Sequence, residues 1–272
     1  MSLPADVMTD NRIIALLSDF GLQDVYVGVM KGAIAQINPQ LKVIDLTHQI
    51  PPQNIAAGRF CLMNAFSYFP PETVFVAVVD PGVGSQRRGV AVQFAGGYLV
   101  GPDNGLFSGV LSLSPAIAAV ELTNSDYWLS PYPSSTFHGR DIFAPVGAHL
   151  ASGVPLEKLG SPIDPTSLVE LPLGFYKMTE NSIIGAIQYI DIFGNLITNI
   201  PATAVEDKRW SIAIANSIVP CGRTYSDVKV GEIITLVGSH GWVEIAVNGG
   251  SAKSQLQVDW GDLVEVVYQT MS

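Results

Sequence analysis

The sequence predicts an α/β N-terminal domain with a largely parallel sheet, followed by a smaller all-β, barrel-like C-terminal domain. In the first half, continuous apolar runs alternate with segments whose apolar residues recur at helical spacing, which is typical of a parallel sheet with covering helices. In the last third, short β-like runs are separated by turn residues with no convincing helix between them, which favours a small barrel or sandwich.

Three strands and two helices alternate in the first half. The predicted strands are residues 12–18, 41–46 and 73–79, and the predicted helices are residues 25–38 and 54–69. The first strand, "RIIALLS", is almost entirely apolar, as expected of a strand buried on both faces. Pro39 ends the first helix, and Asn54 is a suitable N-cap for the second.

The rest of the N-terminal domain is less regular. A hairpin is expected around Gly96 and Gly97, and a closing helix at residues 141–153 that is disturbed by Pro145. The stretch that follows is rich in proline and has no long periodic run, so we interpret it as a linker. The predicted boundaries are 11–160 for the N-terminal α/β domain, 161–182 for the linker and 183–272 for the C-terminal β-barrel domain.

The composition argues against several classes of protein. The 272-residue chain is 48% hydrophobic and 14% charged, so it can bury a large core. Its net charge of −10 argues against a nucleic-acid partner, which needs clustered Lys and Arg. No apolar run reaches the ~18 residues of a membrane helix, and residues 1–11 lack the features of a signal peptide. We therefore expect a cytoplasmic protein without a membrane partner, with Cys61 and Cys221 as ordinary buried residues.

Each of the three predicted strands finishes on or near an aspartate, namely Asp19, Asp45 and Asp80. In a parallel α/β sheet, ligands bind outside the carboxyl ends of the strands. A single aspartate there is most simply a turn residue. Three together, with Ser18 and His48 beside them, favour a binding site.

In the stretch "VVDPGVGSQRRGV", residues 78–90, an aspartate follows the carboxyl end of a predicted buried strand, and two arginines come after it. Its glycines fit neither the P-loop nor the dinucleotide-binding pattern, so it is not a phosphate loop. Arg87 and Arg88 can turn back towards Asp80, where a guanidinium would favour the charged carboxylate. The alternative is a surface ion pair of little energetic value, which is plausible for one arginine but less so for both.

Two further clusters carry polar groups. "STFHGRDIFAP" holds His138, Arg140 and Asp141 within four residues, although a lone histidine usually has a structural role. A zinc site is disfavoured because the four histidines show no i, i+4 pair and no cysteine ligand pattern. "DIFGNLITNI", residues 191–200, combines an acid, an aromatic ring and amides. This set could hold a purine, but a polar turn explains it equally well.

Seven segments together resemble the S-adenosyl-L-methionine (SAM) hydroxide adenosyltransferase family, also called SAM hydrolases, which is related to the SAM-dependent fluorinase and chlorinase. They run in the family's order from about residue 13 to residue 252: "LLSDFGLQDVYVGVMKG", "VIDLTHQIPP", "YFPPETVFVAVVDPGVGSQRRG", "GPDNGLF", "TFHGRDIFAPVGAHLA", "DIFGNLITNI" and "GSHGWVEIAVNGGSA". The resemblance implies an N-terminal α/β domain, a C-terminal β-barrel and a homotrimer. It also implies that SAM binds between one subunit's N-terminal domain and its neighbour's C-terminal domain.

The resemblance also implies roles for residues that would bind SAM. Asp19 would hold the ribose diol, because a carboxylate can accept both hydroxyl protons. Asp191 would pair with the methionine ammonium. Asn195 would read the adenine edge, with Phe193 packed near the base, and Ser239 would contact the methionine carboxylate.

The sequence departs from the halogenases at two of these places. They follow the serine with an arginine, where this chain has His240, and they place a tryptophan in the loop where it has Gln53. The first departure bears on the contact with the methionine carboxylate, and the second on packing against the ribose.

The nucleophile divides the family, and the residues here match its water-using branch. That branch carries an Asp, Arg, His set, which corresponds to Asp80, Arg87 and His138. Halogenases have tyrosine at the Asp80 and His138 positions, and the fluorinase has a halide-binding serine at the Gly139 position. The resemblance therefore implies hydrolysis of SAM to adenosine and L-methionine by attack of water on ribose C5′, without a metal or organic cofactor. The alternatives are a SAM-dependent halogenase and a non-catalytic SAM- or adenosine-binding protein.

Overall fold

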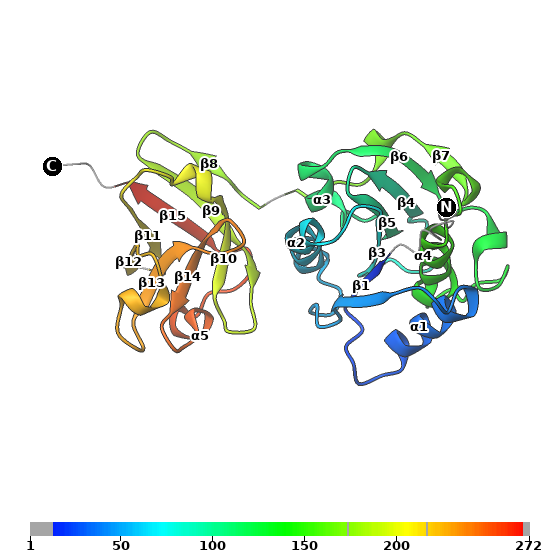
Figure 1. Cartoon of the computed structure of the whole chain (residues 1–272). Helices are drawn as coiled ribbons and strands as arrows, with labels where there is room; N and C mark the ends of the chain where they lie inside the picture. The colour runs from blue at the N-terminus through cyan, green and yellow to red at the C-terminus, as the bar shows by residue number, and fades with distance from the viewer. Residues whose placement is uncertain (1–12, 173, 216, 269–272) are drawn as a thin grey trace, which may run out of the picture. The chain divides into compact units, whose positions relative to one another are not determined.

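The computed structural model of the chain describes residues 13–172, 174–215 and 217–268 (Figure 1). Its internal contacts divide the chain into two compact units, with the division between Leu171 and Pro172. We call these the N-terminal unit and the C-terminal unit. Within the described residues, no helix is both long and apolar enough to span a membrane.

The N-terminal unit contains a seven-stranded mixed sheet in the order β2-β1-β3-β5-β4-β6-β7. Its strands are β1 (Ile14–Ser18), β2 (Val43–Thr47), β3 (Thr73–Val78), β4 (Gly89–Phe94), β5 (Gly97–Pro102), β6 (Ala116–Glu121) and β7 (Ser161–Ile163). Strands β2, β1, β3 and β5 are parallel, while β4 is antiparallel to β5 and β6, and β7 to β6. The three predicted strands and the hairpin are confirmed. The parallel half of the sheet carries the acidic strand ends.

The helices of this unit are α1 (Tyr26–Ile37), α2 (Ile55–Ala65), α3 (Ser108–Leu113) and α4 (Ala144–Ala151). Asn54 caps α2 as predicted, since its side-chain oxygen accepts a hydrogen bond of 3.0 Å from the amide of Ala57. The predicted second helix is shorter than expected, because a 3₁₀ turn at Phe66–Tyr68 follows α2. The helix α3 and the strands β6 and β7 were not predicted.

The predicted closing helix is a π-helical turn at Gly139–Phe143 that continues into α4. Pro145 lies in the first turn of α4 and has no amide hydrogen to donate to the carbonyl of Asp141, four residues earlier. That carbonyl instead accepts a hydrogen bond of 2.9 Å from the amide of Leu129. The disturbance expected at the proline is therefore a local change of helix type that another segment compensates.

The core of the N-terminal unit lies around the parallel strands. Every residue of β1 and of β3 is buried, so apolar side chains fill both faces of the sheet there. Phe143 and Leu150 are fully buried in the same core. Because the strand interiors are occupied in this way, chemistry-bearing side chains gather at the strand ends and in the loops that follow them.

The C-terminal unit is an antiparallel, nearly closed barrel, as the sequence predicts. Its strands are β8 (Lys177–Met178), β9 (Ser182–Ile190), β10 (Leu196–Pro201), β11 (Trp210–Ile214), β12 (Ser217–Pro220), β13 (Ile233–Val237), β14 (Trp242–Val247) and β15 (Leu263–Tyr268). They follow the order β12-β11-β15-β9-β10-β14-β13, with β8 paired to β9. A bridge between Cys221 and Thr235 brings the two ends of this order together.

Two further details differ from expectation. A short helix, α5 (Ala252–Leu256), follows β14 although none was expected. Cys221 is exposed and Cys61 only half-buried, so the prediction that both are buried is wrong. Neither cysteine takes part in a disulfide.

Candidate active site

Asp19 and Asp80 lie at the carboxyl edge of two adjacent parallel strands. Ser18, the last residue of β1, pairs with Val78, the last residue of β3, so the two chains leave the sheet at the same level. Asp45 lies inside β2, near its end, in agreement with the strand predicted at residues 41–46. Its carboxylate is 2.7 Å from the ammonium of Lys31.

Asp80, Arg87 and His138 form one connected cluster in the N-terminal unit. Arg87 Nε donates to both carboxylate oxygens of Asp80, at 2.9 and 3.1 Å, and Nη2 also bonds to Oδ2. The same Nη2 lies 2.8 Å from Nδ1 of His138. The Asp80 and Arg87 side chains are only 5% and 11% exposed, so this ion pair is largely shielded from water.

The guanidinium fixes the protonation of His138. A guanidinium can only donate, so Nδ1 of His138 accepts and the ring proton is on Nε2. Burial lowers the pKa of His138 below 6.5, and the positive charge of Arg87 lowers it further, against the opposing charges of Asp80 and Asp141. The neutral imidazole is therefore the form that fits this site.

Two features hold the cluster together. The buried ring of Phe143 lies under the Arg87 guanidinium, with 5.2 Å from Cζ to the ring centroid, and meets the His138 ring edge-on at 6.4 Å. Gly84 has a positive φ of 76°, and a Cβ there would be 2.4 Å from the carbonyl oxygen of Ser135. A glycine at this position thus lets the loop after Asp80 approach the segment before His138.

Arg88 turns away from this cluster. Its Nη2 lies 2.6 Å from the buried carboxylate of Asp103 and 2.6 Å from the carbonyl of Ser167. The other oxygen of Asp103 accepts from the amide of Val169 at 2.8 Å. One of the two adjacent arginines therefore joins the candidate site, and the other anchors residues 167–169.

Asp19 is half-buried and lies beside an aromatic cluster. Its Oδ2 accepts a hydrogen bond of 2.7 Å from the amide of Gln53. Phe20, next to it, packs edge-on against Phe137 with 5.6 Å between centroids, and Tyr26 packs on Phe137 at 5.2 Å. We did not predict these three rings as part of the site. The available signal was that Phe20 is adjacent to Asp19, and Phe137 to His138.

In the C-terminal unit, Asp191, Phe193 and Asn195 form the turn between β9 and β10. Asp191 Oδ1 accepts from the amides of Phe193 and Asn195, both at 2.9 Å, and Oδ2 accepts from Nδ2 of Asn195 at 2.8 Å. Asn195 is buried, whereas Phe193 is 72% exposed. The structure therefore brings together the predicted acid and amide and leaves the aromatic ring at the surface.

Ser239 is exposed in the turn between β13 and β14, and its neighbour His240 is held by the barrel itself. His240 Nδ1 accepts from the amide of Trp242 at 3.1 Å, which leaves its proton on Nε2. Nε2 lies 2.9 Å from the carboxylate of Glu244. In this structure His240 therefore donates a hydrogen bond to Glu244, a buried carboxylate of the barrel.

Two residues of this region escaped the sequence analysis. Tyr225 donates its hydroxyl to the buried carboxylate of Glu244 at 2.9 Å. Burial raises the pKa of Tyr225, as do the hydrogen bond to Glu244 and the negative charges of Glu244 and Asp191, to about 12. Neither residue stands in a motif that would single it out.

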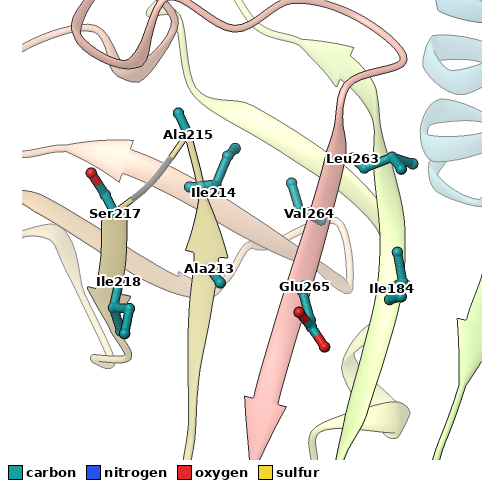
Figure 2. A pocket seen from close by; sticks show the side chains of 9 residues that line it. All are labelled: Ile184, Ala213, Ile214, Ala215, Ser217, Ile218, Leu263, Val264 and Glu265. Atoms are coloured by element: carbon teal, nitrogen blue, oxygen red, sulfur yellow. The ribbon is translucent and has the colours of Figure 1, made fainter.

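A hollow of about 450 Å³ lies elsewhere on the barrel, and its lining comes from β9, β15, β11 and β12 (Figure 2). It is lined by Ile184, Ala213, Ile214, Ala215, Ser217, Ile218, Leu263, Val264 and Glu265. None of the predicted site residues is among them. In the part of the chain that the structure describes, no group of three or more His, Cys, Asp or Glu side chains is arranged to hold a metal ion.

The fold and the site define a two-domain protein with an acid–guanidinium–imidazole cluster beside a parallel sheet and a polar turn on a β-barrel. Two family models match the chain: the SAM hydroxide adenosyltransferase N-terminal domain over residues 14–160 and the corresponding C-terminal domain over residues 185–265. The chain therefore belongs to the SAM hydroxide adenosyltransferase family, as the sequence resemblance predicts.

Similar proteins agree with this placement. A Salinispora tropica protein named (R)-S-adenosyl-L-methionine hydrolase is 41% identical over 254 residues, covering 93% of this chain and 97% of that protein. A Thermus thermophilus protein of the same name is 39% identical, covering 92% and 97%. A fluorinase from Actinopolyspora mzabensis is 29% identical, covering 88% and 91%. The crystal structure of an uncharacterized conserved protein from Thermotoga maritima superposes with a TM-score of 0.88 at 36% identity, covering 94% of this chain and all of that one.

Proposed function

We propose that this chain hydrolyses SAM to adenosine and L-methionine by in-line attack of a water molecule on ribose C5′. The observation that carries the proposal is the shielded cluster of Asp80, Arg87 and His138. Family membership and the hydrolase relatives support the same reaction. The lower identity to the fluorinase also favours water over halide as the nucleophile.

The chemistry of SAM explains why such a cluster is needed. The sulfonium makes C5′ a strong electrophile, and methionine leaves as a neutral thioether, so no acid is required to expel it. Water is a weak nucleophile and must lose a proton as it attacks. The protein's task is therefore to orient one water molecule, accept its proton and stabilise hydroxide character.

The geometry favours one division of roles. Asp80 is the base that accepts the proton, because the unprotonated nitrogen of His138 faces Arg87 and its other nitrogen carries hydrogen. His138 Nε2–H can donate to the water oxygen and so orient its lone pair towards C5′. Arg87 stabilises the developing hydroxide by charge and hydrogen bonding.

The remaining residues bind the substrate. Asp19 holds the ribose hydroxyls, Asp191 pairs with the methionine ammonium, and Asn195 reads the adenine edge. Phe193 packs near the base, and Ser239 contacts the methionine carboxylate. SAM is a substrate here, and the reaction needs neither a metal nor an organic cofactor.

The proposed assembly is a cytoplasmic homotrimer with active sites at subunit interfaces. In it, each SAM meets the N-terminal domain of one subunit and the C-terminal domain of its neighbour. The exposed Phe193 ring supports an interfacial role, because an aromatic side chain at the surface gains most when a ligand or another subunit covers it.

The reaction is tested by a product assay in oxygen-18 water. Purified protein is incubated with SAM, adenosine and methionine are separated, and their isotope content is measured by mass spectrometry. One label in the 5′-hydroxyl of adenosine is the expected result, since it identifies both the bond cleaved and the attacking group. Unlabelled adenosine, or 5′-chloro-5′-deoxyadenosine when chloride is present, would overturn the proposal. Tight SAM binding without turnover would indicate a non-catalytic binding protein.

A further inference from the structure

A chain of polar side chains lies next to the candidate site, and the proposed chemistry does not use it. His48 and Ser18 are 3% and 0% exposed. Ser18 Oγ is 2.7 Å from His48 Nδ1, and His48 Nε2 is 3.1 Å from Asp45 Oδ1. The other oxygen of Asp45 receives the hydrogen bond from Lys31. Burying polar groups such as these costs free energy unless they are hydrogen-bonded. We therefore looked for a role that these side chains have in the structure.

The hydrogen positions in this chain follow from its neighbours. Ser18 Oγ accepts a hydrogen bond of 3.3 Å from the amide of Phe20 and lies 2.7 Å from Nδ1 of His48. The Asp45 carboxylate can only accept, so the proton of the neutral ring is on Nε2, facing Asp45, and Nδ1 accepts from the Ser18 hydroxyl. Among the described residues His48 Nε2 has no regular hydrogen-bond partner, so its contact with Asp45 is mainly an electrostatic attraction.

The set contains Ser, His and Asp, but it is not a nucleophilic triad. Ser18 is completely buried at the end of β1, where a substrate cannot reach its hydroxyl. What the set does reach is the turn at residues 18–21. His48 holds that turn twice, through its side chain on Ser18 and through its carbonyl, which accepts from the amide of Gly21 at 2.7 Å.

Asp19 lies inside this turn. Its carboxylate is fixed by the amide of Gln53, which belongs to the same segment as His48. The segment 48–53 therefore holds the backbone on either side of Asp19 and also orients its carboxylate. Loss of the imidazole would free the Ser18 side of this arrangement and leave the Gln53 contact in place.

We propose that His48 is a positioning residue, which orients Asp19 towards the ribose by holding the turn at residues 18–21. This inference rests on the ribose role given to Asp19 under the proposed function. His48 does not touch the substrate and acts through Ser18 and the backbone of the turn.

Two conservative variants separate this role from simple filling of space. In His48→Asn the amide oxygen takes the place of Nδ1 and still accepts from Ser18. In His48→Gln the amide nitrogen takes the place of Nε2 and faces Asp45 instead. If the contact with Ser18 is what matters, His48→Asn retains more activity than His48→Gln.

The experiment combines these variants with a change in the substrate. The values of kcat and KM are measured for SAM and for an analogue in which hydrogens replace both ribose hydroxyls. Asp19→Asn and His48→Ala should each lower kcat/KM for SAM, the former by about tenfold or more, as expected for a hydrogen bond to a charged group. The double variant should be no worse than Asp19→Asn alone, and His48→Ala should leave turnover of the analogue within about twofold of the parent.

The control is His149→Asn, which removes a half-buried histidine of α4 that packs on Tyr127, away from the cluster. It should leave kcat/KM for SAM unchanged. Multiplying effects of the Asp19 and His48 variants would overturn the positioning role, as would equal losses with SAM and the analogue. If His48→Ala does not fold, a His48→Gln variant as active as His48→Asn would overturn it too. An Asp19→Asn variant with normal kcat/KM would instead refute the ribose assignment, and the His48 role with it.

Discussion

The two clusters of candidate residues are built in different ways. In the N-terminal unit, Asp80, Arg87 and His138 come from separate segments and are joined by side-chain contacts that are largely closed to water. In the C-terminal unit, Asp191 and Asn195 are joined within one short turn, and Phe193 beside them is 72% exposed. One cluster depends on the whole unit being folded, and the other depends mainly on local backbone geometry.

This difference suggests a division of labour. Groups that take part in a bond-making step must be held to within a fraction of an ångström, and buried long-range contacts provide such precision. Groups that only bind a substrate can lie in an exposed turn, since the ligand itself completes their surroundings. Variants in the first cluster should therefore change kcat, and variants in the second should change KM.

The largest expected effect is that of Asp80→Asn. This change keeps the shape of the side chain but removes the base, so kcat should fall by about 10²–10⁴-fold. The dissociation constant for SAM should change by less than about threefold, because Asp80 faces the water rather than the bound substrate in the proposed mechanism. Single-turnover kinetics and calorimetric titration with SAM measure the two quantities. A loss of binding that matches the loss of turnover would contradict the division of labour.

The second effect concerns stability instead of turnover. Arg88→Ala leaves the buried carboxylate of Asp103 without its cation, which should lower the free energy of unfolding by about 3 kcal/mol. Turnover at a temperature where the variant is folded should remain close to that of the parent, because Arg88 points away from the cluster. Urea unfolding and kcat are measured on the same preparation. A large loss of kcat in the fully folded variant would place Arg88 in the catalytic machinery.

The third prediction concerns substrate binding by the cluster in the C-terminal unit. Asp191→Asn removes the charge proposed to pair with the methionine ammonium, so KM should rise by about tenfold while kcat stays within about twofold. Asp259→Asn is a matched control, because Asp259 is an exposed acid of the same unit that pairs with Lys253. Steady-state kinetics give kcat and KM for both variants. A fall in kcat without a rise in KM for Asp191→Asn would contradict its proposed role in binding the ammonium.

The smallest effect is a pH dependence. Burial and the charge of Arg87 lower the pKa of His138 below 6.5, and only the neutral ring can accept the hydrogen bond from Arg87. The acid limb of kcat/KM should therefore have its midpoint below pH 6.5. Over the same range the unfolded chain takes up the proton first, so the contribution of His138 to stability is present above pH 6.5 and is lost as the pH falls. NMR titration of the ring, identified by its absence in His138→Asn, checks the value, and a midpoint above 6.5 would contradict it.

The sequence predicted most of the fold because the signals are strong where strands are buried on both faces. The runs that became β1 and β3 are apolar throughout, and Asn54 caps α2 as its residue type suggests. The elements that were missed are short or carry mixed patterns. Strand β7 has three residues and includes a proline, and its place is decided by pairing with β6 instead of by its own composition.

For the candidate site, the sequence analysis proposed the residues but not how their side chains are connected. Nothing in "RRG" indicates that Arg87 turns towards Asp80 while Arg88 turns to Asp103, because that choice depends on the packing of Phe143 and the segment near Ser167. Tyr225 and Glu244 were missed for a similar reason. A hydroxyl and a carboxylate nineteen residues apart become a pair only when the barrel closes.

The π-helical turn at Gly139–Phe143 has a consequence for how such a site can change over evolution. A π turn contains one residue more than the corresponding α turn, so loss of a single codon there would leave a regular helix. Each residue accounts for about 100° of helical rotation. The segment that ends in His138 would then leave the helix in a new direction and carry its imidazole away from Arg87. One small deletion would thus break the contact between Arg87 and His138 while most of the buried core stayed intact.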